Sequence, residues 1–236
     1  MGLSLHGSAK EDGMTTVRRT KVQVDTRARI VEAATKLFFS RGYNDVRVAE
    51  IAAAAQSNIA SVNYHFGSKE SLFTDIFAAE CEKVASARAT RLDSLLQRNA
   101  QPTVAEVVQA WLDPVFENLA VTESRIIFTH LMGLVLWSDV NDQIKETLSQ
   151  SLAVVDHRFL DVLTRIRPDL SRQTLTWRLF GSLGAYSLIL GHPELLDLLF
   201  GGGTRDGFSD EQLRHHVLAF VTAGLGAPAP PSNSKD

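Results

Sequence analysis

The chain has 236 residues, of which 44% are hydrophobic and 22% are charged, and its net charge at pH 7 is −3. This length allows one or two domains with a large core. A single cysteine, Cys81, excludes an intramolecular disulfide and fits a reducing compartment. The start of the chain is charged, so we expect no signal peptide. The longest apolar run, Ile126–Trp137, is shorter than the roughly 20 residues that a bilayer span needs. We therefore expect a soluble, cytoplasmic protein.

The small net charge conceals an asymmetry along the chain. Residues 14–70 carry nine basic and five acidic residues, a net +4, whereas residues 71–236 carry fourteen and twenty, a net −6. A basic first part on an acidic body suits binding of nucleic acid at one end of the protein. Uneven charge without functional meaning is the alternative.

The first predicted helices follow a polar start. Residues 1–23 have no apolar periodicity, so we predict a disordered tail there. Asp25 or Thr26 can cap the first helix, and Gly42 suits its C-terminal end. Asp45 is expected to cap the second helix, with Arg47 in its first turn. A cation there opposes the helix dipole, so either a phosphate or plain solvation would have to stabilise Arg47.

Residues 47–66 have the pattern of two short helices joined by a tight turn. Gln56–Asn58 interrupt an alanine-rich run, and Ser57 or Asn58 can cap the helix that follows. In that helix we expect one face to pack inward, through Ile59, Val62 and Phe66. The remaining polar side chains suit hydrogen bonds to base edges and phosphates: Ser61, Asn63, Tyr64 and His65. The pattern predicts a helix-turn-helix whose second helix enters a major groove.

This region also resembles a known family. Residues from about 26 to 77 are similar to the DNA-binding domain of the tetracycline-repressor (TetR) family, in the order and spacing of Ile30–Ala34, Leu37–Phe38, Arg41–Tyr43, Ile51–Ala52 and above all Tyr64–Phe73. Gln56 stands where the family usually has Gly, and Asn63 where it more often has Tyr. The resemblance implies that Lys69 contacts the DNA backbone. The predicted DNA-binding residues are Arg47, Ser57, Asn58, Ile59, Ser61, Asn63, Tyr64, His65 and Lys69.

Further helices are predicted after the helix-turn-helix. Ser68 can cap a fourth helix that runs to about Leu96 and links the DNA-binding part to the rest. Four more follow at about 103–119, 123–138, 144–166 and 171–191, and a last one begins at the capping box Ser209–Gln212. No strand pattern is present. We predict an all-α chain of about nine main helices.

The predicted domains follow from these helices. They are a disordered tail (1–23), a DNA-binding domain (24–84), a ligand-binding and dimerisation domain (85–226) and a flexible tail (227–236). The resemblance implies a homodimer through a four-helix bundle of the last two long helices. Small residues allow such close packing. The predicted interface is Phe180, Gly181, Gly184, Leu188, Leu213, Val217 and Phe220. A monomer with two ordinary core helices is the alternative, although it would reach only one half-site.

Large side chains of the middle helices are candidates for a ligand pocket: Trp111, Phe116, His130, Trp137 and Phe159. Core packing is the alternative for each of them. His215 and His216 are adjacent and point about 100° apart, so they cannot share a metal as i, i+4 histidines can. We find no catalytic constellation and expect no enzyme activity, metal or cofactor.

We interpret the chain as a dimeric transcriptional regulator that binds double-stranded operator DNA. The resemblance favours a repressor that a small, largely apolar ligand releases. Residues 58–66 most resemble a branch of the family that includes fatty-acid-responsive repressors, which hints at an acyl ligand. Two alternatives stay open. One is a regulator that needs no ligand, and the other is an all-helical binding protein or enzyme that uses a cavity among the middle helices.

Overall fold

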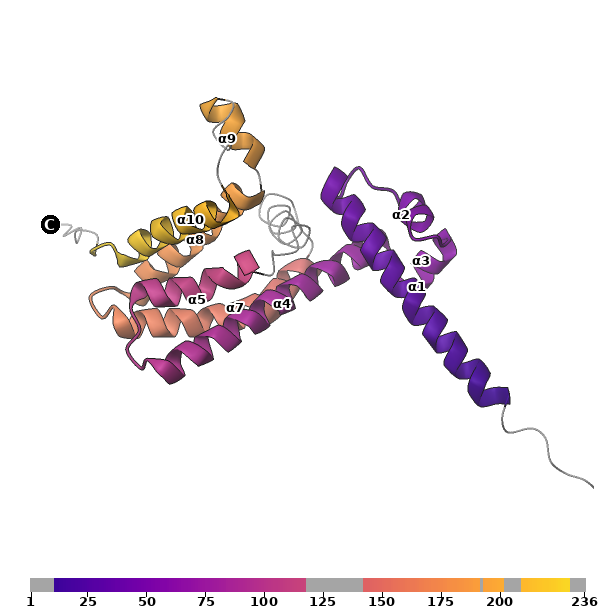
Figure 1. Ribbon diagram of the computed structural model, residues 1–236, viewed down its shortest axis with the longest axis horizontal. Coiled ribbons are helices and arrows are strands. Elements are labelled where there is room, and N and C mark those ends of the chain that lie inside the picture. The colour runs from indigo at the N-terminus through magenta and orange to yellow at the C-terminus, as the bar shows by residue number, and fades with distance from the viewer. Residues whose placement is uncertain (1–10, 118–141, 192, 202–208, 230–236) are drawn as a thin grey trace, which may run out of the picture. The chain divides into compact units, whose positions relative to one another are not determined.

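The computed structural model describes residues 11–117, 142–191, 193–201 and 209–229, and for residues 11–24 it describes the backbone alone. These residues form helices and no strand, which confirms the predicted all-α class (Figure 1). The helices are α1 (Glu11–Arg41), α2 (Val48–Ala54), α3 (Ile59–Phe66), α4 (Lys69–Arg98), α5 (Val104–Glu117), α7 (Asp142–Ile166), α8 (Arg172–Gly191), α9 (Pro193–Phe200) and α10 (Asp210–Gly226). The helix predicted at 123–138 lies outside the described residues.

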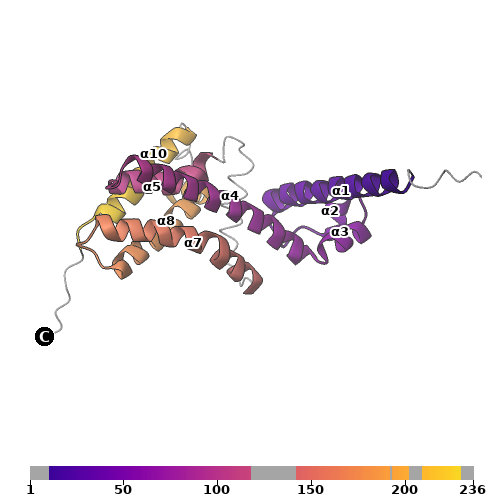
Figure 2. The ribbon, with the colours of Figure 1, turned by 90° about the horizontal axis from the view of Figure 1, so that it is seen from below.

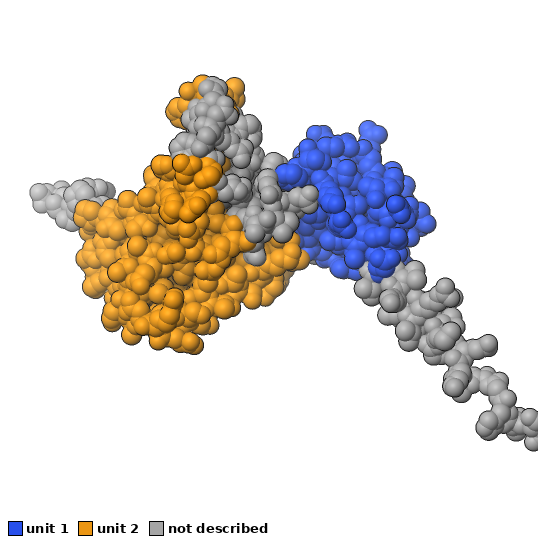
Figure 3. Space-filling view, viewed as in Figure 1, with its two compact units in different colours: residues 1–76 blue, residues 77–236 orange. Residues whose placement is uncertain are grey.

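The chain divides into two compact units, residues 1–76 and residues 77–236 (Figure 3). Our predicted boundary lay after residue 84. The helix α4 runs through both positions without a break, because no proline or glycine interrupts it between Lys69 and Arg98. A boundary inside a continuous helix leaves no signal in the sequence, and only the packing on either side places it.

The first unit packs α1, α2 and α3 against the beginning of α4. Its core contains one face of α1, with Ile30 and Phe38 buried, together with Ile51 from α2. An aromatic cluster joins the elements, since the ring of Phe38 lies 5.5 Å from that of Phe73 and Tyr43 lies 4.9 Å from Phe73. These rings join α1, the loop after it and α4 in one core.

Two helix starts in the first unit differ from our predictions. The structure has α1 beginning at Glu11 rather than near Asp25, so residues 11–23 are helical and not a disordered tail. This stretch contains no proline, and a helix formed further on can extend into it. The second helix is capped at Arg47 and not at Asp45, because the carboxylate of Glu50 accepts from the Arg47 backbone N–H at 2.8 Å. As predicted, Gly42 ends α1, in a left-handed conformation with φ +79°.

The second unit is a helical bundle. In it α5 packs against α7 and α10, and α8 packs against the same two helices (Figure 2). Two predicted capping boxes are confirmed: Thr103 with Glu106 opens α5, and Ser209 with Gln212 opens α10. In the described parts of the chain, none of the helices is both long and apolar enough to span a bilayer.

One helix, α9, was not predicted. It is short, but its ends carry signals, because Pro193 occupies its first position and Gly201 follows it with φ +97°. Our predicted helix at 171–191 ended just before it, and the next predicted helix began at Ser209.

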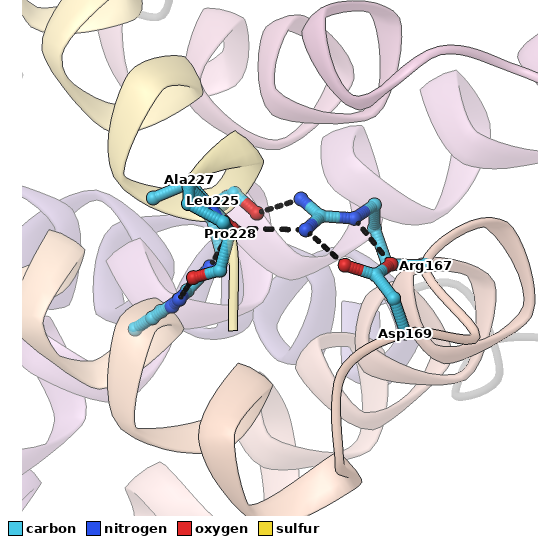
Figure 4. Close-up of polar contacts among 6 residues, drawn as sticks. Arg167, Asp169, Leu225, Ala227 and Pro228 are labelled. Atoms are coloured by element: carbon cyan, nitrogen blue, oxygen red, sulfur yellow. Dashed lines mark hydrogen bonds and ion pairs between the residues drawn. The ribbon is translucent and has the colours of Figure 1, made fainter. Parts of the chain in front are cut away.

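The end of α10 is held by two arginines rather than left loose. Arg167 donates to the backbone carbonyls of Leu225 and Ala227 at 2.8 and 2.9 Å, and Asp169 orients its guanidinium (Figure 4). Arg178 donates to the carbonyls of Ala227 and Pro228 at 2.6 and 2.7 Å. These bonds satisfy carbonyls that a helix end leaves without partners. The predicted flexible tail is thus wrong for its first two residues.

Candidate functional site

The turn between α2 and α3 is tight and well bonded. The backbone N–H of Ser57 donates to the carbonyl of Ala52 at 2.8 Å, and Gln56 between the two helices has φ +50°. Asn58 caps α3, because its Oδ1 accepts from the backbone N–H of Ser61 at 2.8 Å. This choice between Ser57 and Asn58 was open from the sequence. The geometry is that of the predicted helix-turn-helix.

One face of α3 is anchored in the core of the first unit. Val62 and Phe66 are buried, as predicted. Ile59 is not, since 48% of its surface is exposed, so its predicted inward packing is wrong. It is the first residue of α3 and lies beyond the reach of the core. It stays a candidate DNA contact, because an apolar side chain can contact a thymine methyl group.

The opposite face of α3 presents polar groups. Asn63 is exposed, and Tyr64 is 73% exposed, which is a large fraction for an aromatic residue. Ser61 and His65 are half-buried on the two sides of this face. A side-chain amide can pair with adenine through two hydrogen bonds, and hydroxyl or imidazole groups can donate to phosphates. The face therefore combines an amide with hydroxyl and imidazole groups, all of which can form hydrogen bonds.

An arginine at the start of α2 adds charge at this end of the unit. Arg47 is exposed at the N-cap position. Its neighbour Arg41 is engaged, with Nη1 2.7 Å from Glu50 Oε1 and Nη2 donating to the carbonyl of Asp45 at 2.6 Å. Hydrogen bonds from Arg41 and from the Arg47 backbone lower the pKa of Glu50. The guanidinium of Arg41 is thus held by Glu50 and Asp45.

The structure turns Lys69 inward. Its ammonium donates to the backbone carbonyls of Tyr43 and Val46 at 2.8 and 3.0 Å, and it lies 4.1 Å from the centre of the Tyr43 ring. The family resemblance implied a contact with the DNA backbone for this residue.

Arg27, a cation on α1 that the sequence did not indicate, contacts the end of α3. The guanidinium carbon of Arg27, on α1, lies 4.9 Å from the centre of the Phe66 ring, and its Nη2 lies 2.9 Å from Oδ2 of Asp75 on α4. Arg27 and Asp75 are 48 positions apart, so no local pattern could pair them. Together they tie the end of α3 to two neighbouring helices.

The predicted pocket residues are core residues where the structure describes them. Trp111 and Phe116 on α5 and Phe159 on α7 are buried, whereas His130 and Trp137 lie outside the described residues. A cleft of about 830 Å³ lies between α4 and α5, and none of the predicted residues lines it. Its lining is mostly polar: Arg91, Ser94, Leu95, Arg98, Asn99, Glu106, Gln109, Ala110 and Asp113. Within the described ranges, no group of acidic, histidine or cysteine residues could hold a metal.

A buried polar cluster that the sequence did not indicate joins four helices of the second unit. Arg88 on α4 is completely buried and donates to the carbonyl of Trp111 on α5 at 2.9 Å and to Asp156 on α7 at 2.9 Å. Its third partner, at 3.4 Å, is the hydroxyl of Tyr186 on α8. Burial alone would lower the pKa of Arg88, but Asp156, Tyr186 and Cys81 together outweigh it, and the net pKa is raised. The guanidinium therefore stays charged inside the bundle.

An apolar stripe is exposed along α8. Trp177 and Phe180 are 68% and 57% exposed, and Leu188 and the two glycines Gly181 and Gly184 continue the same face. Phe220 on the neighbouring α10 is 66% exposed. These belong to the predicted subunit interface, except Trp177, which we had not included.

Two other predicted interface residues are placed differently. Val217 is 2% exposed inside its own subunit, so its side chain cannot face a partner, and that assignment is wrong. Leu213 is half-buried. Both stand on the side of α10 that packs on the bundle, because a four-residue step keeps them on one face of the helix. The sequence pattern identified apolar residues on α10, but it did not show which of them pack on the bundle and which are exposed.

Comparisons with known proteins agree with this geometry. Residues 30–76 match the family described as bacterial regulatory proteins, tetR family, and residues 109–224 match the tetracyclin repressor-like C-terminal domain. The probable HTH-type transcriptional regulator YttP of Bacillus subtilis is 26% identical over 87 residues, which are 37% of this chain and 42% of that protein. The HTH-type transcriptional repressor NicS of Pseudomonas putida is 41% identical over 51 residues, 22% of this chain and 24% of that protein. The chain thus matches less than half the length of each relative.

A solved structure resembles a larger part of the chain. It is the transcriptional regulator FadR from Bacillus subtilis in complex with stearoyl-CoA, at a TM-score of 0.59 and 18% identity, over 84% of this chain and 98% of that chain. At this identity the likeness shows a shared fold.

Proposed function

Because the chain belongs to the tetracycline-repressor family of bacterial regulators, we propose that it is a sequence-specific DNA-binding transcriptional repressor that a small ligand releases from its operator. The observation that carries this proposal is the exposed polar face of α3, held by Val62 and Phe66 in a well-bonded helix-turn-helix. Base edges in a major groove are read by side chains of this kind on an exposed helix.

The residues of this face have separate roles in the proposal. Asn63 reads a base, with Ser61 and Ile59 beside it, while Tyr64, His65 and Arg47 contact phosphates. Ser57 and Asn58 place backbone N–H groups at the N-terminus of α3, where a phosphate is favoured by the helix dipole. The amide of Asn63 supports this division, since it is exposed and can form a bidentate pair with adenine.

We propose that two copies bind one operator. The exposed stripe of α8 and Phe220 of α10 would meet their counterparts across a two-fold axis, which buries aromatic surface that a monomer leaves in water. Glycines at positions 181 and 184 have no side chain to keep a second helix away, and a Cβ atom added at either would meet nothing within 4 Å in its own subunit. A dimer also doubles the DNA contacts across two half-sites.

The ligand is proposed to act through α4. This helix begins in the first unit and continues into the second, where Arg88 ties it to α5, α7 and α8. A ligand among the helices of the second unit would shift α4 and so the register of two recognition helices, which must lie about 34–36 Å apart or a multiple. The complex of the FadR relative with stearoyl-CoA supports a largely apolar, acyl-type ligand.

Selection of genomic fragments by the purified protein tests the DNA-binding part of this proposal. We expect enrichment of a sequence with two-fold symmetry and half-sites separated by one helical turn or a multiple. Enrichment without any common sequence would contradict sequence-specific binding. Enrichment of a single unpaired half-site would contradict binding as a dimer.

The release by ligand has its own test. Acyl and aromatic compounds are screened by their effect on the melting temperature, and the affinity of a compound that raises it is measured with and without saturating operator. Linkage requires operator DNA to weaken ligand binding by the same factor by which the ligand weakens DNA binding, typically about 5–150-fold. Equal affinities in the two states would contradict release, whatever the affinity.

A further inference from the structure

The two helices of the proposed subunit interface, α8 and α10, are joined by an arginine at the end of α10. Arg178, on α8, donates from Nη1 to the carbonyl oxygen of Ala227 at 2.6 Å and from Nη2 to that of Pro228 at 2.7 Å. Ala227 is the C-cap residue of α10. A side chain of one interface helix thus holds the chain where the other interface helix ends.

A second arginine reaches the same place from the end of α7. Arg167 follows the last residue of α7, and it donates to the carbonyl oxygens of Leu225 and Ala227 at 2.8 and 2.9 Å (Figure 4). Asp169 accepts from Nε and Nη2 of this guanidinium at 2.8 and 2.7 Å, and the Arg167 side chain is only 14% exposed. Hydrogen bonds from an ionised donor are roughly twice as strong as neutral ones. We call Arg167 and Arg178 the arginine clamp.

The clamp adds direction to contacts that have none. The face of α10 that packs on the bundle is apolar, with Val217, Val221 and Leu225 at most 2% exposed. Burial of apolar surface is not directional, so it favours this face without fixing the position of α10 along its axis. Hydrogen bonds have narrow ranges of distance and angle. The clamp therefore fixes the end of α10, as Arg214 fixes its beginning through Asp113 of α5 at 2.9 Å.

The surface proposed for the dimer takes side chains from both helices that the clamp joins. Trp177, which directly precedes Arg178 on α8, is 68% exposed, and Phe180 is 57% exposed. Phe220, on α10, is 66% exposed. The shape of this surface depends on how α10 lies against α8, and a two-fold axis repeats any displacement of α10 in both copies.

We propose that Arg167 and Arg178 are positioning residues for the subunit interface, and that they hold α10 against α8 in the arrangement in which two copies associate. This inference rests on the proposed dimer and concerns what prepares its surface. A helix whose end is already fixed has less order to gain on association, so more of the energy of burying the apolar surface is left for binding.

Replacing Arg178 by methionine tests the proposal. Arg178→Met keeps a long unbranched side chain and removes the donors. We expect the dissociation constant of the dimer to rise about tenfold, because both copies lose the fixed end of α10. Light scattering over a dilution series measures it. Arg178→Lys can still donate to one of the two carbonyls, so its dissociation constant should lie between the two, and it replaces Arg178→Met if that variant does not fold.

A matched control stands on the same helix. Arg172→Met makes the same substitution in α8, but the partner of Arg172 is Asp161 on α7, in an exposed ion pair that does not involve α10. The dissociation constant of this variant should equal that of the wild type. An increase as large as that of Arg178→Met would overturn the proposal, because any lost charge on α8 would then weaken the dimer.

The dissociation constant also separates positioning from a purely structural role. It is measured at a temperature at which circular dichroism shows the wild type and the variants fully folded, so a lower melting temperature alone cannot change it. A lower melting temperature with an unchanged dissociation constant would mean that the clamp only stabilises the fold, and it would overturn the proposal.

Hydrogen exchange locates the effect within α10. In Arg178→Met the amides of residues 222–226 should exchange faster than in the wild type, whereas those around Arg214 should change little. Unchanged exchange at the end of α10 would overturn the positioning role. A wild type that stays monomeric at every concentration would contradict the proposed dimer and, with it, this inference. A wild-type dimer that Arg178→Met leaves equally tight would contradict the inference alone.

Discussion

Arg88 and Asp156 form an ion pair inside the helical bundle, with Nη1 of the arginine 2.9 Å from Oδ1 of the aspartate and no part of the arginine side chain exposed. The same carboxylate oxygen accepts from Nε1 of Trp111 at 2.8 Å. A charge buried in this way depends on its partner, because removing one member leaves the other without compensation in a medium that solvates it poorly.

Asp156→Ala should therefore destabilise the protein by roughly 3–5 kcal/mol, since Arg88 would be left buried and unpaired. The free energy of unfolding from urea titration measures this. Asp161→Ala is the matched control on the same helix, because the pair of Asp161 with Arg172 is exposed and such pairs contribute about 0–1 kcal/mol. Equal losses for the two variants would mean that Arg88 is solvated and does not form a buried polar cluster.

A bulky residue at position 184 tests the proposed dimer. A Cβ atom added at Gly184 meets nothing within 4 Å in its own subunit, and we expect Gly184→Leu to leave the fold of the monomer intact. Across a two-fold contact it would overpack the interface, at a cost of roughly 1–3 kcal/mol for each copy. Light scattering over a dilution series measures the dimer. If the variant dimerises as tightly as the wild type, Gly184 lies outside the interface.

The turn of the helix-turn-helix stores strain at Gln56. Its φ of +50° is unfavourable for a residue with a side chain, by roughly 1–2 kcal/mol, whereas glycine adopts it freely. Replacing Gln56 with glycine removes this strain, but the greater freedom of glycine in the unfolded chain offsets part of the gain in stability. Gln56→Gly should therefore raise the free energy of unfolding by about 0.5–1 kcal/mol. Gln56→Val should lower it, because branched side chains tolerate this conformation poorly. Unfolding curves that rank the valine variant above the glycine variant would contradict the strain.

Glu50 should make the first unit sensitive to acid. Hydrogen bonds from Arg41 and from the Arg47 backbone lower its pKa below the ordinary value of 4.5. A depressed pKa contributes stability that is fully present above the unfolded value and is lost as the pH falls through the folded value. The stability difference between the wild type and Glu50→Gln should thus be constant above about pH 5 and shrink below it. A difference that grows on acidification would contradict this direction.

Short-range signals in the sequence identified most helix ends. Asn58, Thr103 and Ser209 cap their helices through bonds to residues three positions on, and such bonds depend only on local sequence. Gly42 ends α1 because glycine readily adopts the left-handed conformation, which is also a local signal. The extended start of α1 was missed because weak periodicity does not exclude a helix that continues from a stable neighbour.

Long-range pairs were outside the reach of the sequence. Arg88 and Asp156 are 68 positions apart, and nothing near either residue indicates the other. The same holds for Lys69, which stands 26 positions from the Tyr43 carbonyl. Val217 and Phe220 both lie on an apolar helix, and only the packing of α10 against α5 decides that one is buried and the other exposed.

The central claim is that the exposed face of α3 reads DNA sequence, and Asn63 tests it most directly. Selection of binding sequences from a random library is repeated with the wild type and with Asn63→Ala, whose exposed side chain can be removed without disturbing the core. We predict that the variant keeps its affinity for non-specific DNA but loses discrimination at one or two positions of each half-site, by roughly 1–3 kcal/mol. The same preferred sequence, with the same discrimination at every position, would contradict the assignment of α3 as the reading helix.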